Sequence, residues 1–255
     1  MPFVRILYDS HSGSHTGQGA ETAMDLGLVG PAQSKYLFHF TGRNSGSRPN
    51  WVPEHIRGMS PQERLDAILR EEKFRVFAPF GAAMPGESGS LGMPCLCLSE
   101  SSTEHLAHLV AARGFSPWGL VFSREAIHAK GGGAVAYLPE HAHDDLRRSG
   151  LGHWAVRTSE GSTWLHEREW RVPFASGEAM IKSVMAILIA DAEWRPAMEP
   201  SGQWVDGETE LPLPGPVSPE AVEQDDYPRL WRDSSIWVWN QQKRDFSKYA
   251  PGELR

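Results

Sequence analysis

Cysteine is scarce in this sequence: only Cys95 and Cys97 occur among 255 residues. So few cysteines argue against a fold held together by disulfides. Their C-x-C spacing places both side chains on one face of a strand. We therefore expect buried thiols rather than a metal site or a disulfide, in a reducing environment.

Long apolar runs are also missing. No stretch approaches the ~20 apolar residues that span a bilayer, and the first residues lack a secretory signal pattern. These absences predict a cytoplasmic protein without membrane contact. The formal net charge of −7 argues against broad, non-specific binding of nucleic acid, although a local basic groove is compatible with it.

Several catalytic fingerprints are absent as well. The sequence has no G-x-x-x-x-G-K-[ST] phosphate loop, no G-x-S-x-G nucleophile elbow and no H-E-x-x-H zinc motif. The triple glycine at 131–133 follows a short helical segment and precedes a strand, the reverse of the order in a dinucleotide-binding turn. Nothing therefore indicates Rossmann, P-loop or α/β-hydrolase chemistry.

Histidine is abundant, and two groups resemble partial metal sites. His105 and His108 lie three residues apart on an expected helix, and His141, His143 and Asp144 fall within four residues. Neither group is a complete recognised ligand set, so we assign no metal ligands. A metal-dependent hydrolase or nuclease stays open as an alternative function, beside solvated histidines.

The elements that the sequence predicts are short. Two capping boxes, Ser60-Pro61-Gln62-Glu63 and Ser101-Ser102-Thr103-Glu104, precede apolar stripes and predict helices near 61–72 and from 103 to Gly114. The absence of regular strand–helix alternation favours an α+β fold over a doubly wound sheet. Strands are expected at 3–8, 35–41, 74–80, 94–99, 118–122, 134–138, 164–173 and 183–190.

Composition divides the chain into three regions. Residues 1–34 hold a short strand and a flexible polar loop, residues 35–190 hold most regular elements, and residues 191–255 form a loop-rich extension. The stretch 191–228 of this extension is acidic and Pro-rich and predicts loops. The aromatic stretch after it predicts a segment packed on the core, with Trp237 and Trp239 on one face of a strand.

The most informative segment is Trp164–Val172, which contains the acids Glu167 and Glu169. Strand alternation places both carboxylates on one face, with Leu165 and Arg171, about 7 Å apart by the strand rise. Two acids so close repel unless a cation, a hydroxyl or developing positive charge lies between them. The segment therefore predicts either a site or an exposed strand face with a solvated charge ladder.

Other candidate binding residues lie on or next to predicted strands. His39 and Thr41 share one face at the end of an aromatic strand and could donate hydrogen bonds to a sugar or phosphate, whereas Phe38 and Phe40 share the other. Taken alone, His39 also fits a half-buried histidine with a satisfied ring. Taken alone, Tyr137 fits ordinary packing in a sheet. The Ser99–Ser102 run fits the segment that leads into the capped helix.

Six short pieces follow one another along the chain: His39-Phe40-Thr41, Leu65–Leu69, Pro94–Glu100, Trp118–Ser123, Ala134–Tyr137 and Glu167-Arg168-Glu169-Trp170-Arg171. In this order they resemble proteins of the AbiGi abortive-phage-resistance type and, beyond them, the ADP-ribosyltransferase fold, including the DarT toxins that modify DNA. The resemblance covers roughly residues 35–190. It implies an ADP-ribosyltransferase-like split β-sandwich.

The resemblance also implies roles for residues. Glu169 would orient a ribose hydroxyl of NAD and stabilise the positive charge that develops when the nicotinamide–ribose bond breaks, while Glu167 would engage the incoming nucleophile. The His39-Phe40-Thr41 strand would bind the adenosine-side ribose or phosphates. In this family a middle strand carries a second NAD-site motif, which is either an aromatic residue or an S-T-S-like run. No clear S-T-S run occurs here, so either Tyr137, stacking on nicotinamide, or Ser99 with Ser101 would provide this middle motif.

The implied function is transfer of ADP-ribose from NAD to a protein or nucleic acid, in phage defence or a toxin–antitoxin system with a cognate toxin or antitoxin as partner. The E-x-E pair favours a protein acceptor and the likeness to DarT favours a nucleic-acid base. A non-catalytic binding or antitoxin-type protein on the same scaffold is the alternative from a different class.

Overall fold

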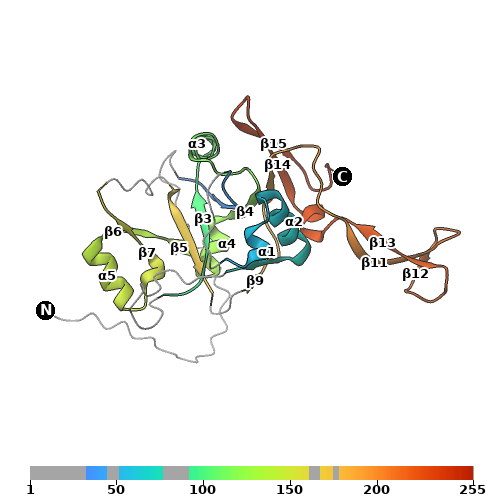
Figure 1. Ribbon diagram of the computed structural model, residues 1–255. Coiled ribbons are helices and arrows are strands. Elements are labelled where there is room, and N and C mark those ends of the chain that lie inside the picture. The colour runs from blue at the N-terminus through green and yellow to red at the C-terminus, as the bar shows by residue number, and fades with distance from the viewer. Residues whose placement is uncertain (1–32, 45–51, 77–91, 161–166, 175–177, 255) are drawn as a thin grey trace, which may run out of the picture.

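The computed structural model describes residues 33–44, 52–76, 92–160, 167–174 and 178–254 (Figure 1). A mixed sheet of eight strands, flanked by short helices, dominates it. The expectation of an α+β fold is confirmed. The strand expected at 3–8, with almost all of the N-terminal region before residue 35, lies outside the described residues.

The large sheet combines strands from both ends of the described chain. All of its neighbouring pairs are antiparallel except β10 and β14, which are parallel. Two of its strands come from the extension after residue 190, so that extension completes the sheet. In spatial order the strands are β15 (Asp245–Tyr249), β14 (Ser235–Asn240), β10 (Ala186–Ile189), β4 (Gly119–Ser123), β1 (Tyr36–Phe40), β3 (Cys95–Glu100), β8 (Glu169–Pro173) and β5 (Gly133–Ala134).

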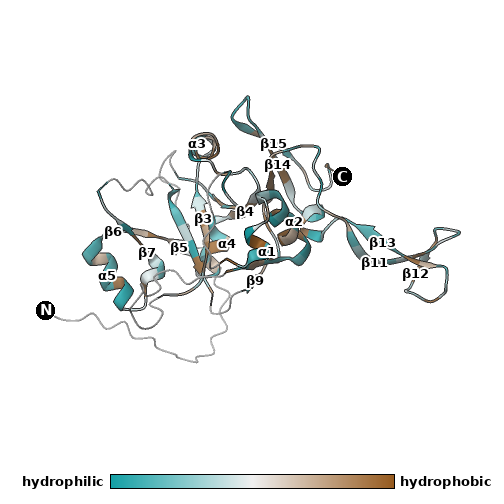
Figure 2. Cartoon of the chain, in the orientation of Figure 1, coloured by the Kyte–Doolittle hydropathy of each residue, from teal (hydrophilic) through white to brown (hydrophobic). Residues whose placement is uncertain are grey.

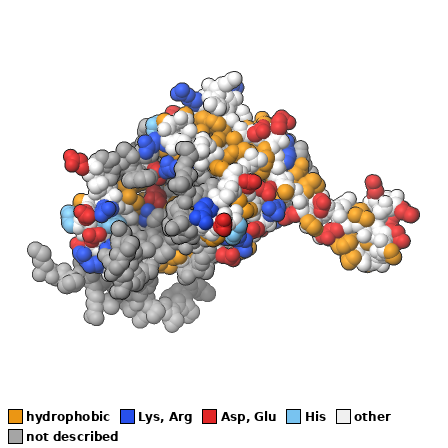
Figure 3. All heavy atoms as spheres, viewed as in Figure 1, with side chains coloured by type: hydrophobic (Ala, Val, Ile, Leu, Met, Phe, Trp, Pro, Cys, Tyr) orange, Lys and Arg blue, Asp and Glu red, His pale blue; other side chains and the backbone are white. Residues whose placement is uncertain are grey.

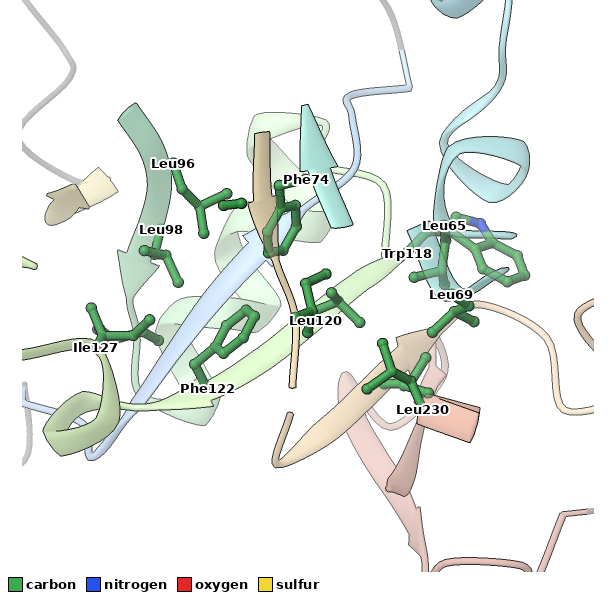
Figure 4. Packing of buried hydrophobic residues seen from close by; sticks show 14 of the residues in the cluster. Leu65, Leu69, Phe74, Leu96, Leu98, Trp118, Leu120, Phe122, Ile127 and Leu230 are labelled. Atoms are coloured by element: carbon green, nitrogen blue, oxygen red, sulfur yellow. The ribbon is translucent and has the colours of Figure 1, made fainter. Parts of the chain in front are cut away.

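One face of the sheet carries the larger core, and we call it the α2 face. Strand residues such as Leu37, Leu120 and Ile187 pack there against Leu65 and Leu69. All five are fully buried. Figure 4 labels Leu120, Leu65 and Leu69 among the residues of this core. Helices α2 (Pro61–Glu71), α4 (Arg124–Ala129) and α6 (Arg229–Asp233) contribute to this core, together with the two-stranded sheet of β2 (Lys73–Arg75) and β9 (Glu178–Met180).

The opposite face, which we call the α3 face, carries a smaller core. Phe38, Val121, Leu188 and Trp237 pack there against Leu106 of helix α3 (Thr103–Arg113). Trp237 and Trp239 both belong to this cluster, so the expected shared face of the two indoles is confirmed. The sheet thus separates two sets of side chains, and which face a residue occupies decides which site it can join.

Both long helices begin with the predicted kind of cap. The Ser60 hydroxyl of α2 accepts a hydrogen bond from the Glu63 amide, and the Glu63 side chain accepts one from the Ser60 amide. In α3 the cap is Ser102, one residue later than expected, and its hydroxyl accepts from the His105 amide. The box at Ser101 was therefore wrong by one position, because the Ser101 hydroxyl is buried against Ser99.

Two strand predictions need correction. The segment 134–138 forms two strands: β5 ends at Ala134 in the large sheet, and β6 (Ala136–Pro139) pairs in parallel with β7 (Ala155–Thr158). These last two strands pack with α5 (Glu140–Arg148) and the 3-10 turn Gly152–Trp154. Tyr137 therefore belongs to a separate small sheet. Of the strand expected at 74–80, only the beginning lies among the described residues, as β2.

The acidic segment predicted as loops is a projecting three-stranded sheet, so the loop prediction was wrong. Its strands are β11 (Glu199–Asp206), β12 (Pro212–Leu213) and β13 (Ala221–Asp226), and it extends from the body as an arm (Figures 1 and 2). Residues 199–226 hold eight carboxylates and no Lys or Arg. Red and orange side chains cover the arm in Figure 3.

Excising the arm is expected to leave the body folded. Pro200 and Asp225 are paired opposite each other, so a two-residue Asn-Gly turn can replace 201–224. The unfolding free energy should change by less than about 1 kcal/mol, because a shorter surface connection costs little and the arm's strands form their own sheet. Urea unfolding measures this, and a loss of several kcal/mol would show that the arm is integral to the core.

No helix in the described ranges has the length and apolarity to cross a membrane.

Candidate functional site

The E-x-E segment does not form the strand that alternation predicts. Residues 161–166, with Trp164, Leu165 and His166, lie outside the described ranges. Arg168 has a φ of +45°, in the left-handed region, so β8 begins only at Glu169. Glu167 therefore precedes the strand, and its expected place in a regular ladder with Glu169 was wrong. From Glu169 onward alternation holds, with Trp170 and Val172 buried in the α2-face core.

Glu169 is held by Arg171 on the α3 face. Arg171 Nε donates to Glu169 Oε1 and Arg171 Nη2 donates to Glu169 Oε2, both at 2.9 Å. The Arg171 side chain is only 4% exposed, whereas that of Glu169 is 15% exposed. Arg171 Nη1 also donates to the backbone carbonyls of His153 and Ala155, at 2.8 and 3.2 Å. A buried guanidinium with four hydrogen bonds thus fixes a carboxylate that solvent can still reach.

Glu167 is paired with a different arginine. Arg43 Nη2 donates to Glu167 Oε1 at 2.6 Å, and the Arg43 guanidinium carbon lies 4.0 Å from the centroid of the Phe115 ring. The two side chains are 37% and 19% exposed, so the pair is accessible. Each acid of the E-x-E pair therefore has its own cation, which explains how the two carboxylates lie in one segment.

Ser99 and Tyr137 both converge on the E-x-E segment. Ser99 lies directly opposite Glu169 in the register of β3 and β8, and its hydroxyl donates to the Glu167 carbonyl at 2.5 Å. The Tyr137 hydroxyl accepts a hydrogen bond from the Glu169 amide at 2.9 Å. Ser101 is hydrogen-bonded to Ser99 at 3.1 Å. Residues from three distant segments thus meet around Glu169, and both candidates for the middle motif are present.

The surroundings of this cluster shift two pKa values. Burial raises the pKa of Tyr137, and the charges of Glu169 and Glu167 add to the rise, while the hydrogen bond from the Glu169 amide opposes it. Burial also raises the pKa of Cys97 well above its usual value, and the Glu169 charge and a hydrogen bond to that carboxylate contribute. The phenol and the thiol therefore stay protonated near neutral pH and can donate hydrogen bonds.

The strand His39-Phe40-Thr41 is split between the two faces. His39 packs edge-on against Phe74, 4.8 Å between ring centroids, and therefore lies on the α2 face. Thr41 is buried, and its hydroxyl donates to the carbonyls of Pro61 and Trp118. Only Phe40, packed against Phe115 on the α3 side, shares a face with Glu169. The structure does not bring His39 and Thr41 together with the E-x-E pair.

Burial lowers the pKa of His39, while a hydrogen bond between Nδ1 and the Cys97 carbonyl, 2.9 Å long, opposes the shift. Burial also lowers the pKa of His153, helped by the positive charge of Arg171. Both histidines thus favour the neutral ring in the folded protein.

These two histidines predict acid sensitivity. Both titrate near 6.5 in the unfolded chain, so their contribution to stability is complete above that pH. As pH falls through 6.5 toward the lowered folded pKa values, the unfolded state binds protons first and the free energy of unfolding decreases. Urea unfolding between pH 7.5 and 5 should show this fall, and it should be smaller in a His39→Gln, His153→Gln double variant. An equal fall in both proteins would contradict the assignment.

Sequence reasoning missed Glu100 as a buried charge. Its carboxylate, 8% exposed, accepts hydrogen bonds from the Ser34 amide and from Trp170 Nε1, at 3.1 and 2.9 Å. Arg124 and Arg168 lie 3.6 and 3.4 Å from the same carboxylate. The available signal was a glutamate ending the apolar strand Cys95–Leu98, followed by a serine-capped helix. Glu100 lies on the α2 face, away from Glu169.

The histidine groups do not assemble further within the described ranges. No group of three or more His, Cys, Asp or Glu residues there is arranged to hold a metal ion. His105 and His108 stack on each other in α3, with ring centroids 6.0 Å apart. His141 and His143 lie on α5, and His143 Nδ1 lies 3.4 Å from Asp144 Oδ1. Cys95 and Cys97 are free thiols, Cys95 buried and Cys97 partly buried.

Comparisons with known proteins returned no match: no family model, no curated protein and no solved structure is significantly similar to this chain. The site must therefore be argued from its own geometry. It offers a fixed, partly exposed carboxylate, a second carboxylate on an accessible ion pair, and neighbouring hydroxyls. Such a set can orient a sugar hydroxyl and stabilise positive charge beside it.

Proposed function

We propose that the chain is an ADP-ribosyltransferase-like protein that cleaves NAD at the Glu169 cluster and passes ADP-ribose to a macromolecule. One observation carries the proposal: Arg171 holds the Glu169 carboxylate with two hydrogen bonds, while the Tyr137 and Ser99 hydroxyls bond to the Glu169 amide and the Glu167 carbonyl of the same segment. Two strands that are far apart in sequence, β3 and β6, thus hold the backbone around Glu169, and Arg171 of the same strand fixes the orientation of its carboxylate. A solvated charge ladder would not need such support.

Glu169 carries the central chemistry of the proposed reaction. Breaking the nicotinamide–ribose bond generates an oxocarbenium-like centre, and a fixed negative charge beside it lowers the energy of that state. Arg171 occupies one lone pair on each oxygen, the Cys97 thiol makes a further hydrogen bond to the same carboxylate, and one lone pair is left for a ribose hydroxyl. The guanidinium lessens the negative charge that Glu169 presents, so its main contribution is to hold the carboxylate in position.

The neighbouring residues take supporting roles. Tyr137 lies beside Glu169 and supplies a ring for the nicotinamide, and the Ser99 hydroxyl anchors the Glu167 carbonyl. Glu167 would engage the incoming nucleophile after exchanging Arg43 for it, which the exposure of that ion pair permits. Of residues 39–41, Phe40 lies on the α3 face, which also carries Glu169. The proposal leaves out the nucleotide contacts that the resemblance gives to His39 and Thr41. His39 packs on Phe74 and the Thr41 hydroxyl donates to the Pro61 carbonyl, so both side chains point away from Glu169.

The biological setting in the proposal rests on the resemblance to AbiGi-type and DarT-like proteins. It is a cytoplasmic role in phage defence or in a toxin–antitoxin system, with a protein or nucleic acid as acceptor. The acidic net charge favours a protein.

A second candidate is a non-catalytic binding protein on the same scaffold. The specific observation in its favour is that both carboxylates are ion-paired, each to its own arginine. A surface with two satisfied ion pairs can recognise a partner without chemistry, as complementary charges do at interfaces.

Nicotinamide release by the full-length protein distinguishes these functions. Purified protein is incubated with NAD alone, and with cell lysate, DNA or RNA, and free nicotinamide is quantified by chromatography. The transferase predicts release that rises with the acceptor fraction. Absence of release in every mixture, together with no detectable NAD binding, would favour the binding protein.

A further inference from the structure

A cavity lies on the α3 face, between the start of α3 and strands β1, β14 and β15. Its volume is about 220 Å³. Tyr36 and Trp237 contribute aromatic walls and meet edge to face, 5.3 Å between ring centroids. Leu106 and Phe38, both buried, complete its apolar lining.

Two lysines line this cavity. Lys248 Nζ lies 4.0 Å from the centroid of the Trp237 ring and 6.0 Å from that of Tyr36, and Lys35 Nζ lies 5.3 Å from the Tyr36 centroid. Among the residues that the structure describes, no carboxylate forms an ion pair with either lysine. Their charges are held in place by aromatic rings and are available to an anion.

Helix α3 adds further positive potential. Its first residues, Thr103 and Glu104, line the cavity, and the first amides of a helix have no intrahelical acceptor. One opposing charge is present, because the Glu104 side chain also lines the cavity. Thus two ammonium groups and a helix N-terminus face one carboxylate, on a chain that is acidic as a whole.

We propose that this cavity is a binding site for a small phosphorylated ligand with an aromatic ring, the chemistry of a mononucleotide. Its phosphate would lie between Lys35, Lys248 and the first turn of α3, with the ring against Tyr36. Lysine binds phosphate as a point charge, and tyrosine offers a face for stacking. The site does not depend on NAD cleavage.

The cavity is connected to the Glu169 cluster. Ser101 lines the cavity and is hydrogen-bonded to Ser99, whose hydroxyl donates to the Glu167 carbonyl. A ligand that moves Ser101 would therefore shift Ser99 and, through its hydrogen bond, the backbone carbonyl of Glu167.

Calorimetric titration of the full-length protein with AMP, inorganic phosphate and adenosine tests the site. AMP should bind more tightly than either fragment, because the lysines hold the phosphate and the ring adds stacking. Equal affinities for AMP and phosphate would show that the cavity binds an anion without contacting the ring. That result would overturn the assignment to a ligand with an aromatic ring. No binding of AMP at millimolar concentration would overturn the site.

Charge variants decide whether this cavity is where AMP binds. Lys248→Met should weaken AMP binding about tenfold or more, and Lys243→Met, on the loop after β14, should leave it unchanged. Glu104→Gln should strengthen binding, since it removes the one opposing charge. A strengthened affinity cannot arise from misfolding. Failure of both Lys248→Met and Glu104→Gln to change the affinity would contradict the proposal.

Discussion

Replacing Arg171 by Met is expected to lower the free energy of unfolding by about 3–5 kcal/mol, the usual cost of removing one partner of a buried ion pair. Three acceptors lose their donor at once: the Glu169 carboxylate and the carbonyls of His153 and Ala155. The methionine keeps most of the buried volume, so the loss reports on polar contacts rather than on a cavity. Urea unfolding of both proteins gives the difference.

A matched surface pair provides the control for Arg171. Arg157 Nη1 donates to Glu140 Oε1 at 2.8 Å, but the two side chains are 54% and 70% exposed. Arg157→Met should therefore cost less than about 1 kcal/mol. Adding Glu169→Gln to Arg171→Met should recover some of the lost stability, because it removes the unpaired charge. A cost below about 1 kcal/mol for Arg171→Met, no larger than that of an exposed pair, would show that Arg171 does not anchor the cluster.

Glu169→Gln is expected to lower nicotinamide release from NAD about 10²- to 10³-fold, the scale seen when one preorganised electrostatic group is removed from an active site. Glutamine keeps the shape of the side chain and removes the charge that, in the proposed reaction, stabilises the oxocarbenium-like centre. The structural loss should be smaller than in Arg171→Met, since the amide oxygen still accepts one bond from Arg171.

The rate constants of Glu169→Gln and Glu140→Gln should be compared at equal protein concentration. Glu140 is an exposed glutamate with an arginine partner, so it controls for loss of a surface charge. Release by Glu140→Gln should equal that of the native protein. If Glu169→Gln releases nicotinamide as fast as the native protein, Glu169 has no role in the chemistry.

Local chemistry made several features of this structure predictable. The Ser60 box and the apolar stripe behind it specify α2 without reference to the rest of the chain. The apolar run Ala186–Ile189 specifies a strand buried on both faces. The acid pair at 167 and 169 pointed to the segment where hydroxyls and arginines converge. In each case the signal lies within a few residues of the feature.

The remaining features depend on contacts between distant residues. Arg43 and Glu167 are 124 positions apart, so their pairing leaves no local trace. The positive φ of Arg168 breaks an alternation that the sequence continues unchanged. Tyr137 reaches Glu169 only because β6 pairs with β7 instead of extending the large sheet. The acidic arm, rich in Gly, Pro and Ser, forms strands through its own register rather than through an apolar pattern.

Placement of the nucleotide on the α3 face is the central claim, and binding of an uncleavable NAD analogue tests it most directly. Full-length protein is titrated with carba-NAD, in which carbon replaces the ring oxygen of the nicotinamide ribose. The native chain should bind one molecule, Tyr137→Ala should bind it at least tenfold more weakly, and His39→Gln should bind it within twofold of native. No binding by the native chain, or loss of binding in His39→Gln with Tyr137→Ala unaffected, would contradict the claim.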